Sequence, residues 1–244
     1  MIRIFRPLPV GSLKLLVFDL DGTLIDSAQD LSNSVNAALI HVGRAPLPDP
    51  VIAGFVGNGA PMLVRRSLAF GDGTPVDEVD EEHMAQAYPF FLDHYRAHKL
   101  DFTYAYPGVL DSLAALHTPP DGTPRTMAVL TNKPVGPAQG ICEGLGMAPY
   151  FLHIYGGNSF PVKKPDPMGL RALMDETGVR PEETVMIGDS KVDVLTAHNA
   201  GVWSLGCAFG FGPQNLMDTP PDILVDSAAD WTAALSPAKI ETRR

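Results

Sequence analysis

The stretch VFDLDGTLIDS, residues 17–27, places two aspartates one residue apart, Asp19 and Asp21, directly after an apolar run. A buried pair of like charges is costly unless a cation lies between them or the site performs chemistry. The run LKLLVFDLD (13–21) is typical of a buried strand, and the segment after it has a helical character. The stretch therefore predicts a strand that ends in a functional site.

Two further apolar runs of the same kind follow, TMAVLTNK (126–133) and TVMIGDS (184–190), and each precedes a helix-like segment. Weaker strand candidates lie at 152–157, 202–208 and 222–225. Strands that alternate with helices indicate βα units and a mostly parallel sheet that is covered on both faces. We therefore expect an α/β fold whose core is a Rossmann-like, doubly wound parallel sheet.

Polar residues stand at the carboxyl ends of the three stronger strands, namely Asp19, Thr131 and Asp189. In sheets of this kind, ligands bind outside the carboxyl ends of the strands. The three residues therefore predict one ligand site at this edge of the sheet.

The alternation of strands and helices stops between residues 26 and 104, where the sequence favours helices alone. The helices expected there cover about 26–42, 49–55, 60–70 and 77–98. Asp26 or Ser27 is a candidate cap for the first of them, and Gly43 is its candidate end. We expect an α-helical cap domain at 26–104, inserted into a core domain formed by 1–25 and 105–244.

Composition and charge bound the class of protein. The 244 residues are 45% apolar and 19% charged, an ordinary globular balance with ample material for a core. The net charge of −10 argues against nucleic acid as a partner, and no apolar run is long enough to span a membrane. A small anionic substrate is compatible with this charge, because a local lysine or a bound metal ion can reverse the sign within a cleft.

The cysteines and the first residues bear on localisation. Cys142 and Cys207 are far apart and lack CxxC spacing, which indicates reduced thiols in a cytoplasmic protein. The first twelve residues, MIRIFRPLPVGS, are too short and too interrupted by proline for a signal peptide. We interpret them as a surface extension ahead of the first strand.

Four motifs occur in order along the chain: DLDGT (19–23), TNK (131–133), KKPDP (163–167) and GDSKVD (188–193). Together they resemble the motifs of haloacid-dehalogenase-superfamily phosphatases, and with their spacing they cover nearly the whole chain. The TNK variant and the segment GFVGNGAPMLVRRSL (54–68) resemble phosphoglycolate phosphatases in particular. The resemblance implies a small phosphorylated metabolite as substrate and Mg²⁺ as cofactor.

Asp19 and Asp21 are the candidate catalytic pair. An aspartyl-phosphate on Asp19 would split the hydrolysis of a phosphate ester into two easier steps. Asp21 would protonate the leaving alkoxide and then activate water. The resemblance implies the same roles, and dehalogenases that resemble this family lack a carboxylate at the second position. A turn or helix cap would explain the DGT residues but not a second aspartate at the strand end.

GDSKVD adds Asp189 and Asp193, four residues apart at a strand end and the start of the next helix. With Asp19 and Asp21 they would bring four carboxylates together, and Mg²⁺ suits such hard oxygen ligands. The resemblance implies that Asp19 and Asp189 bind Mg²⁺ by their side chains and Asp21 by its backbone carbonyl. Asp193 would bind directly or through water, or would be an ordinary aspartate of a first helical turn.

The TNK motif holds candidate phosphate ligands. The Thr131 hydroxyl suits a phosphate oxygen, and Asn132 offers amide donors, although both residue types are also common in turns. Lys133 is either a substrate ligand or a solvated lysine.

The KKPDP motif holds a candidate catalytic cation. The family pattern K-P-x-P selects Lys164, whose ammonium would neutralise Asp19 and the phosphoryl group. Lys163 is expected to be exposed.

Substrate choice is expected to lie in the helical insert. Glycines around Asn58 let the backbone approach a ligand just before a helix begins. Arg65 and Arg66 are candidates to bind a substrate carboxylate, and Arg66 matches the family pattern better. Two solvated arginines near a helix start are the alternative.

The leading hypothesis is a Mg²⁺-dependent phosphatase for small phosphate monoesters, with 2-phosphoglycolate as the first candidate. Sugar phosphates, nucleotides and pyrophosphate are alternative substrates. A phosphomutase that resembles β-phosphoglucomutase is a second hypothesis, against which the GNGA segment argues. A phospho-acceptor signalling module is a third, but it leaves Asp21 and the insert unexplained and needs only about half this length.

Overall fold

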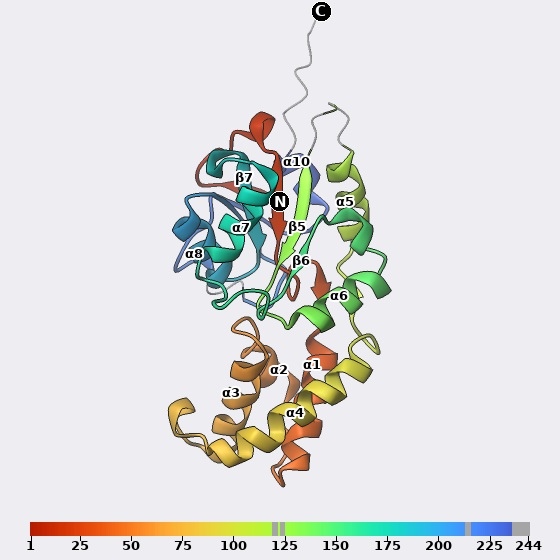
Figure 1. The fold of residues 1–244 in the computed structure, drawn as a ribbon, viewed down its shortest axis with the longest axis vertical. Coiled ribbons are helices and arrows are strands. Elements are labelled where there is room, and N and C mark those ends of the chain that lie inside the picture. The colour runs from red at the N-terminus through yellow and green to blue at the C-terminus, as the bar shows by residue number, and fades with distance from the viewer. Residues whose placement is uncertain (119–121, 123–124, 213–215, 236–244) are drawn as a thin grey trace, which may run out of the picture.

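The structure, a computed structural model, describes residues 1–118, 122, 125–212 and 216–235. Within these ranges a sheet with helices packed against it forms one body, and a group of helices forms a second body beside it (Figure 1). This arrangement confirms the expected fold class, a doubly wound α/β core with a helical insert.

A mostly parallel sheet forms the centre of the first body. In the described residues, seven strands are paired in the order β1-β9-β8-β7-β2-β5-β6, and β1 is antiparallel to β9 while the other pairs are parallel. In spatial order the strands are β1 (Ile2–Ile4), β9 (Ile223–Val225), β8 (Trp203–Cys207), β7 (Thr184–Gly188), β2 (Leu15–Phe18), β5 (Thr126–Leu130) and β6 (Ile154–Tyr155). The order places the three strands of the motif runs, β7, β2 and β5, side by side.

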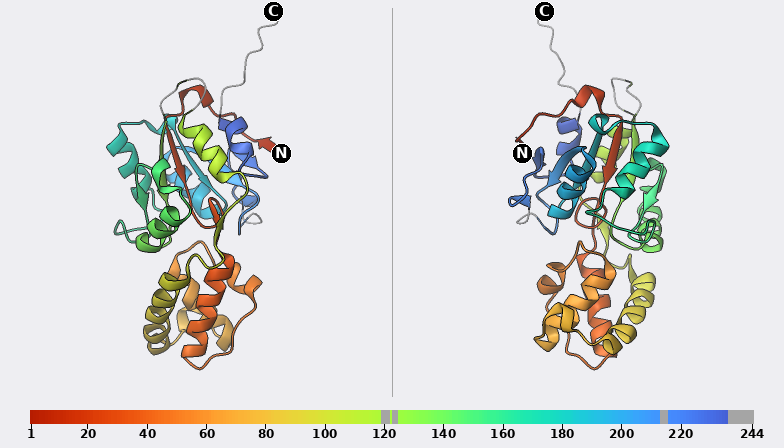
Figure 2. Two further views of the ribbon diagram at one scale, coloured as in Figure 1. Left: turned by 90° about the vertical axis from the view of Figure 1, so that its right-hand side faces the viewer. Right: turned by 60° about the vertical axis from the view of Figure 1, so that its left-hand side comes forward.

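Helices cover both faces of the sheet (Figure 2). These helices are α5 (Val109–His117), α6 (Val135–Gly144), α7 (Met168–Thr177), α8 (Lys191–Ala200) and α10 (Asp230–Leu235). Buried residues of α5, α6 and α10 belong to one hydrophobic cluster, and those of α7 belong to a second. The sheet is therefore the middle layer of three.

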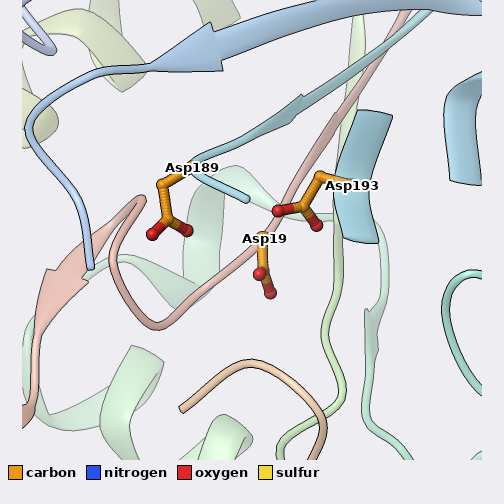
Figure 3. A group of neighbouring side chains, drawn as sticks. All are labelled: Asp19, Asp189 and Asp193. Atoms are coloured by element: carbon orange, nitrogen blue, oxygen red, sulfur yellow. The ribbon is translucent and has the colours of Figure 1, made fainter. Parts of the chain in front are cut away.

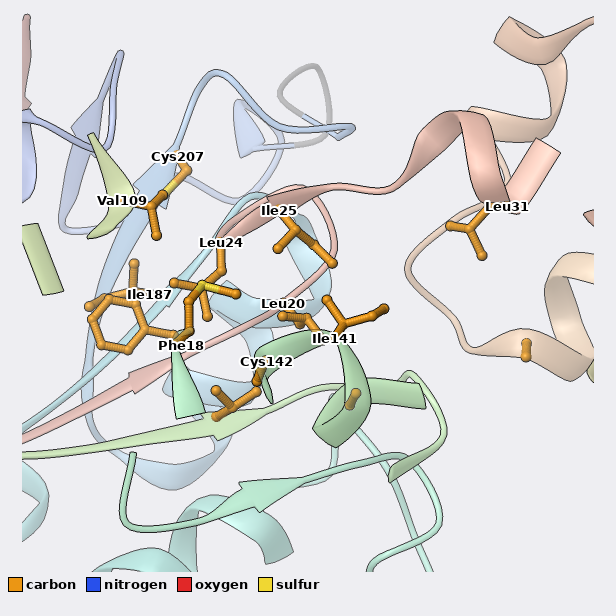
Figure 4. Close-up of a cluster of buried hydrophobic side chains, with 14 of the residues drawn as sticks. Phe18, Leu20, Leu24, Ile25, Leu31, Val109, Ile141, Cys142, Ile187 and Cys207 are labelled. Carbon is orange, nitrogen blue, oxygen red and sulfur yellow. The ribbon is translucent and has the colours of Figure 1, made fainter. Parts of the chain in front are cut away.

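Strand β2 shows why both faces must be covered. Its four residues are fully buried, and they alternate between the two clusters: Leu16 and Phe18 join the first, and Leu15 and Val17 join the second. Phe18 packs against the Trp231 ring with centroids 5.4 Å apart. Figure 4 shows Phe18 among its apolar neighbours in the first cluster.

The second body consists of helices that fold between β2 and β5 in the sequence. They are α1 (Ala28–His41), α2 (Asp49–Ala53), α3 (Ala60–Asp72) and α4 (Glu81–His98). A short antiparallel ribbon of β3 (Ile25–Asp26) and β4 (Tyr104–Ala105) lies where the chain leaves and re-enters the sheet body. Figures 1 and 2 show the helical body facing the carboxyl ends of β2 and β5.

Local hydrogen bonds fix the ends of these helices. Asp26 Oδ1 accepts the backbone N–H of Ala28 at 3.1 Å, and Gly43 adopts a φ of +74° just after the last turn of α1. The last insert helix begins at Glu81 rather than at 77, because Asp80 Oδ1 caps it by accepting the N–H of Glu82 at 2.9 Å.

Single 3₁₀ turns complete the described structure. They are η1 (Val10–Ser12), η2 (Val76–Glu78), η3 (Ala148–Tyr150) and η4 (Pro181–Glu183). None of the helices in the described ranges combines the length and the apolar character needed to cross a bilayer.

The expectation that the first twelve residues only extend over the surface is wrong. Residues 2–4 form β1 and pair with β9 at one edge of the sheet. Arg3 makes an ion pair of 2.7 Å with Asp226, and the amino group of Met1 lies 3.0 Å from Asp230. The three residues of β1 are interrupted by Arg3 and are mostly exposed, so they show no apolar run that would predict a strand.

Candidate active site

A cavity lies between the carboxyl edge of the sheet and the helical body. Seven of the predicted site residues line it: Asp19, Asp21, Asn58, Thr131, Asn132, Lys133 and Asp189. Residues of the loop after α2 and of α4 line its other side. Both bodies therefore contribute to one site.

Asp19 follows the last residue of β2 and continues the strand pairing, since its N–H donates to the Ile187 carbonyl at 2.8 Å. Its Oδ1 accepts the Leu20 N–H at 2.7 Å and lies 3.0 Å from Lys164 Nζ. Burial raises the pKa of Asp19 to about 6, and the Lys164 ammonium opposes this shift. The strand end thus holds a carboxylate oriented by one amide and one cation.

Asp189 follows β7 and is held by the loop after β8. Its Oδ2 accepts the backbone N–H groups of Phe211 at 2.8 Å and Gly212 at 3.2 Å. Thr23 donates its hydroxyl to Oδ1 at 3.2 Å. Burial, together with the nearby charge of Asp193, raises the pKa of Asp189 to about 8. The site therefore leaves the charge of this carboxylate incompletely compensated.

Asp193 lies in the first turn of α8 and is almost fully buried. Its Oδ2 accepts the backbone N–H and the hydroxyl of Ser190, at 3.1 Å and 2.7 Å, and so caps the helix. Its Oδ1 accepts from Lys164 Nζ at 2.6 Å. Lys164 is also buried and bridges Asp193 to Asp19.

The carboxylates of Asp19, Asp189 and Asp193 form a compact acidic group (Figure 3). One oxygen from each lies within 4.8 Å of the others, and all three residues are buried. The single ammonium of Lys164 pairs with Asp19 and Asp193, so it faces three carboxylates, and burial raises the pKa of both Asp19 and Asp189. Hard, closely spaced oxygens with excess negative charge fit a small divalent cation.

Asp21 lines the same cavity but is not part of this acidic group. Ser27 donates its hydroxyl to Asp21 Oδ1 at 2.6 Å, and Lys133 Nζ lies 2.8 Å from Oδ1 and 3.1 Å from Oδ2. Lys133 is buried, which excludes the alternative that it is a solvated surface lysine. Both partners fix the Asp21 carboxylate in one orientation.

Thr131 and Asn132 use their polar atoms differently. Thr131 is buried, lines the cavity and accepts the Lys133 N–H at 3.3 Å, so its hydroxyl proton stays available for an acceptor. Asn132 donates from its amide nitrogen to the Gly57 and Lys164 carbonyls, each at 3.0 Å. The amide of Asn132 therefore ties the loop after α2 to the loop that carries Lys164.

Lys163 also connects the two bodies. It is exposed, as expected, and it donates to the backbone carbonyl of Asn58 at 2.7 Å. The Asn58 loop is thereby held against the sheet body.

The structure does not bring the two arginines of α3 into the cavity. Arg66 donates to the Phe55 carbonyl at 3.2 Å, and Arg65 pairs with Glu81 at 2.7 Å. Neither is among the residues that line the cavity. Their side chains stabilise the helical body.

Three further polar residues, Ser190, Ser27 and Tyr95, contribute to the site beyond those that the motifs predict. Ser190 carries a signal, because a serine three residues before Asp193 matches a capping box. Ser27 donates to Asp21 across the turn at 22–24, and no local pattern relates this serine to the carboxylate. Tyr95 of α4 lines the cavity from the opposite body, and no local pattern relates it to the motifs.

The chain is similar to known proteins over most of its length. Residues 16–207 match the family described as haloacid dehalogenase-like hydrolase. A phosphoglycolate phosphatase of Pseudomonas fluorescens is 40% identical over 226 residues, which are 91% of this chain and 80% of that protein. One of Vibrio vulnificus is 39% identical over 220 residues, which are 89% of this chain and 93% of that protein.

Among solved structures, a predicted phosphoglycolate phosphatase from Haemophilus somnus superposes with a TM-score of 0.83 and 31% identity. The match covers 90% of this chain and 96% of that one. The family match spans the strand ends that carry Asp19, Thr131 and Asp189. The chain therefore belongs to the haloacid dehalogenase-like hydrolases.

Proposed function

We propose that this protein is a Mg²⁺-dependent phosphatase that hydrolyses small phosphate monoesters, with 2-phosphoglycolate as its substrate. The observation that carries the proposal is the buried Asp19 carboxylate at the cavity, 3.0 Å from Lys164 and beside a second, separately held carboxylate at Asp21. The relatives named phosphoglycolate phosphatase support the choice of substrate.

In this mechanism, an Asp19 oxygen forms a bond to the phosphorus atom while the bond from phosphorus to the ester oxygen breaks. Asp21 gives its proton to the leaving oxygen and then takes one from the water that attacks the aspartyl-phosphate. Inorganic phosphate leaves, and the Asp19 carboxylate is restored. Lys164 and the Thr131 hydroxyl would bind phosphoryl oxygens, and the Lys133 ammonium would bind the substrate.

The acidic group supports the choice of cofactor. Asp19 and Asp189 would hold Mg²⁺ by their side chains, Asp21 by its backbone carbonyl, and Asp193 directly or through water. When bound, the ion supplies positive charge to the phosphoryl group. Asp193 Oδ1 and Oδ2 already accept from Lys164 and Ser190, which favours the arrangement through water.

The size of the cavity supports a small substrate. Its volume is about 120 Å³, below the roughly 300–1,000 Å³ of pockets that bury drug-sized ligands. We propose that residues 26–104 act as a cap that closes this space over the substrate and excludes water. The contacts of Gly57 and Asn58 with the sheet body support this role.

A cytoplasmic location and the absence of nucleic acid and membrane partners stay predictions. The free, buried thiols of Cys142 and Cys207 support a reducing compartment.

The test is kcat/KM with Mg²⁺ across 2-phosphoglycolate, sugar phosphates, nucleoside monophosphates, pyrophosphate and β-glucose 1-phosphate. We expect 2-phosphoglycolate to be preferred by at least about tenfold. A preference for another ester would overturn the choice of substrate. Formation of glucose 6-phosphate without release of phosphate would overturn hydrolysis in favour of a phosphomutase.

A further inference from the structure

A tyrosine of the helical body presents an unpaired hydroxyl at the cavity. Tyr95 of α4 lines the cavity together with Asp19 and Asp21, and only 2% of it is exposed. Its hydroxyl oxygen is buried and makes no hydrogen bond with any residue in the described ranges. Buried polar groups in native proteins nearly always have a partner, so an orphaned one beside a ligand cavity calls for an explanation.

A buried cation stands next to this hydroxyl. Lys133 Nζ lies 4.5 Å from the centre of the Tyr95 ring and 2.8 Å from Asp21 Oδ1. An ammonium group has three N–H donors, and Asp21 Oδ1 and Oδ2 accept two of them. The ammonium also acts on the phenol, since it opposes the rise in the pKa of Tyr95 that burial causes. A ligand oxygen between the two groups can accept from the remaining N–H of Lys133 and from the Tyr95 hydroxyl.

The two groups suit a carboxylate. A carboxylate has two oxygens, which can accept one bond from a cationic N–H and one from a neutral O–H. Burial raises the pKa of Tyr95 to about 12, so the phenol keeps its proton and acts as a donor at neutral pH. The phosphoryl group belongs at Asp19 and Lys164, so the pair is free for another part of the substrate.

The position of Asp21 relates the pair to the leaving group. Asp21 must contact the ester oxygen that it protonates, and Lys133 lies directly beside Asp21. In 2-phosphoglycolate a single methylene separates this oxygen from the carboxylate. The carboxylate would therefore lie within reach of Lys133 and Tyr95 when the ester oxygen is at Asp21.

We propose that Tyr95 is a specificity-determining residue that, together with Lys133, binds the carboxylate of an acidic leaving group. The inference rests on the proposed function and deepens it. It assigns to α4 the role that is expected of Arg66 from the sequence; the Arg66 guanidinium donates to the Phe55 carbonyl instead and does not line the cavity. A short acidic ester is selected because its two carboxylate oxygens can accept from both donors.

The test compares two substrates that differ only at the carboxylate. Ethyl phosphate replaces the carboxylate of 2-phosphoglycolate by a methyl group and keeps the phosphate ester. Tyr95→Phe removes the hydroxyl and leaves the ring over Lys133. Tyr88→Phe is the matched control, because Tyr88 lies on the same helix and does not line the cavity.

For Tyr95→Phe we expect kcat/KM for 2-phosphoglycolate to fall about 10- to 100-fold, as for a lost hydrogen bond to a charged group. The loss should appear mainly in KM, because the carboxylate does not react. Ethyl phosphate hydrolysis should change by less than about twofold, and Tyr88→Phe should match the wild type on both esters. The melting temperature should stay equal or rise, since the variant removes a buried, unpaired hydroxyl.

Each other outcome overturns the inference. An unchanged preference for 2-phosphoglycolate in Tyr95→Phe would show that the carboxylate is bound elsewhere, while the proposed function stands. Equal losses on both esters would give Tyr95 a role in phosphoryl transfer or in the fold. A wild-type enzyme that does not distinguish the two esters would contradict the proposed substrate, and the inference would fall with it.

Discussion

The Asp19 carboxylate is buried between a lysine and two further carboxylates. Lys164 Nζ lies 3.0 Å from it, and the oxygens of Asp189 and Asp193 are within 4.8 Å. Such an arrangement costs stability unless cations compensate the charge, and it concentrates reactivity at the strand end. Catalysis at Asp19 is therefore expected to depend on the exact positions of these side chains.

Gly22 shows how tightly the site restricts its neighbours. It has a φ of +81°, and a Cβ at this position would collide with the Asp189 carboxylate. For Gly22→Ala we expect a loss of about 1–2 kcal/mol in the free energy of unfolding from the left-handed backbone alone. Displacement of Asp189 should also reduce kcat/KM by at least about tenfold. Urea unfolding and phosphate release measure the two effects.

Gly43 provides the matched control. It has a similar φ of +74°, and a Cβ there would meet nothing within 4 Å. Gly43→Ala should lose a comparable backbone energy and keep full activity. Equal activities in the two variants would contradict the idea that Gly22 makes room for Asp189.

At the level of single residues, the sequence predicts what local motifs encode. The strand-end positions of Asp19, Thr131 and Asp189 follow from apolar runs, and the structure brings all three to one cavity. Tyr95 could not be predicted in this way. Its approach to Lys133 depends on how α4 packs against the sheet body, and no spacing within the chain records that packing.

Among the elements, strand β2 lies at the centre of the sheet and positions the catalytic residue. It is fully buried, pairs with β5 and β7, and is followed directly by Asp19. A strand with apolar residues on both faces cannot lie at a surface, so its burial positions the catalytic end. The packing of its side chains is therefore expected to contribute strongly to the free energy of unfolding of the whole core.

Phe18 tests this expectation. Its side chain is fully buried and packs against the rings of Phe151 and Trp231, with centroids 6.0 Å and 5.4 Å away. Phe18→Ala should lower the free energy of unfolding by about 3–5 kcal/mol, measured in urea. Phe5→Ala is the control, because Phe5 is 52% exposed, and it should change stability by less than about 0.5 kcal/mol. Similar losses in both variants would contradict the assignment of β2 to the core.

Elements with an apolar run or a helical period were predictable, including the short strands β6 and β9 within 152–157 and 222–225, and β1 was not. The runs at 126–133 and 184–190 contain β5 and β7, and the insert helices lie close to their expected ranges. Strand β1 is stabilised by pairing with β9, some 220 residues away in the sequence, and by the ion pair of Arg3 with Asp226. Such long-range partners leave no mark in a three-residue segment.

On the scale of the whole molecule, the site depends on contacts between the two bodies. Asn132 and Lys163 bond to the loop after α2, and Lys133 lies against Tyr95 of α4. The cavity exists only while the helical body stays in this position. The free energy of unfolding of the whole molecule also depends on the protonation of the acidic group at the same interface.

That linkage predicts a pH dependence. In the metal-free protein the pKa values of Asp19 and Asp189 are raised from 3.8 to about 6 and about 8. Raised values mean that the folded state holds these protons more tightly, so their contribution to stability falls as the pH rises from about 4 to 8. A cation that binds the ionised carboxylates restores it. Mg²⁺ should therefore raise the melting temperature more at pH 8 than at pH 5.

The increase in stability depends on the ratio of the free Mg²⁺ concentration to its Kd. A free ion at 100 times its Kd stabilises the folded state by about 2.7 kcal/mol. Removal of the metal with a chelator should reverse the shift and abolish turnover. Asp189→Asn, which removes one of the proposed ligands, should lose most of the increase at pH 8. The same increase at both pH values, or an undiminished one in Asp189→Asn, would contradict the proposed metal site.

The central claim is that Asp19 forms a covalent bond to the phosphoryl group. The most direct measurement is to mix enzyme, Mg²⁺ and 2-phosphoglycolate, quench in acid, reduce with borohydride and sequence the peptides by mass spectrometry. Borohydride reduces an aspartyl-phosphate to homoserine. We expect homoserine at position 19 of the wild type only when substrate is present. The Asp19→Asn variant should form no homoserine and release no phosphate. Phosphate release by Asp19→Asn, or wild-type turnover with no homoserine at position 19, would contradict the account.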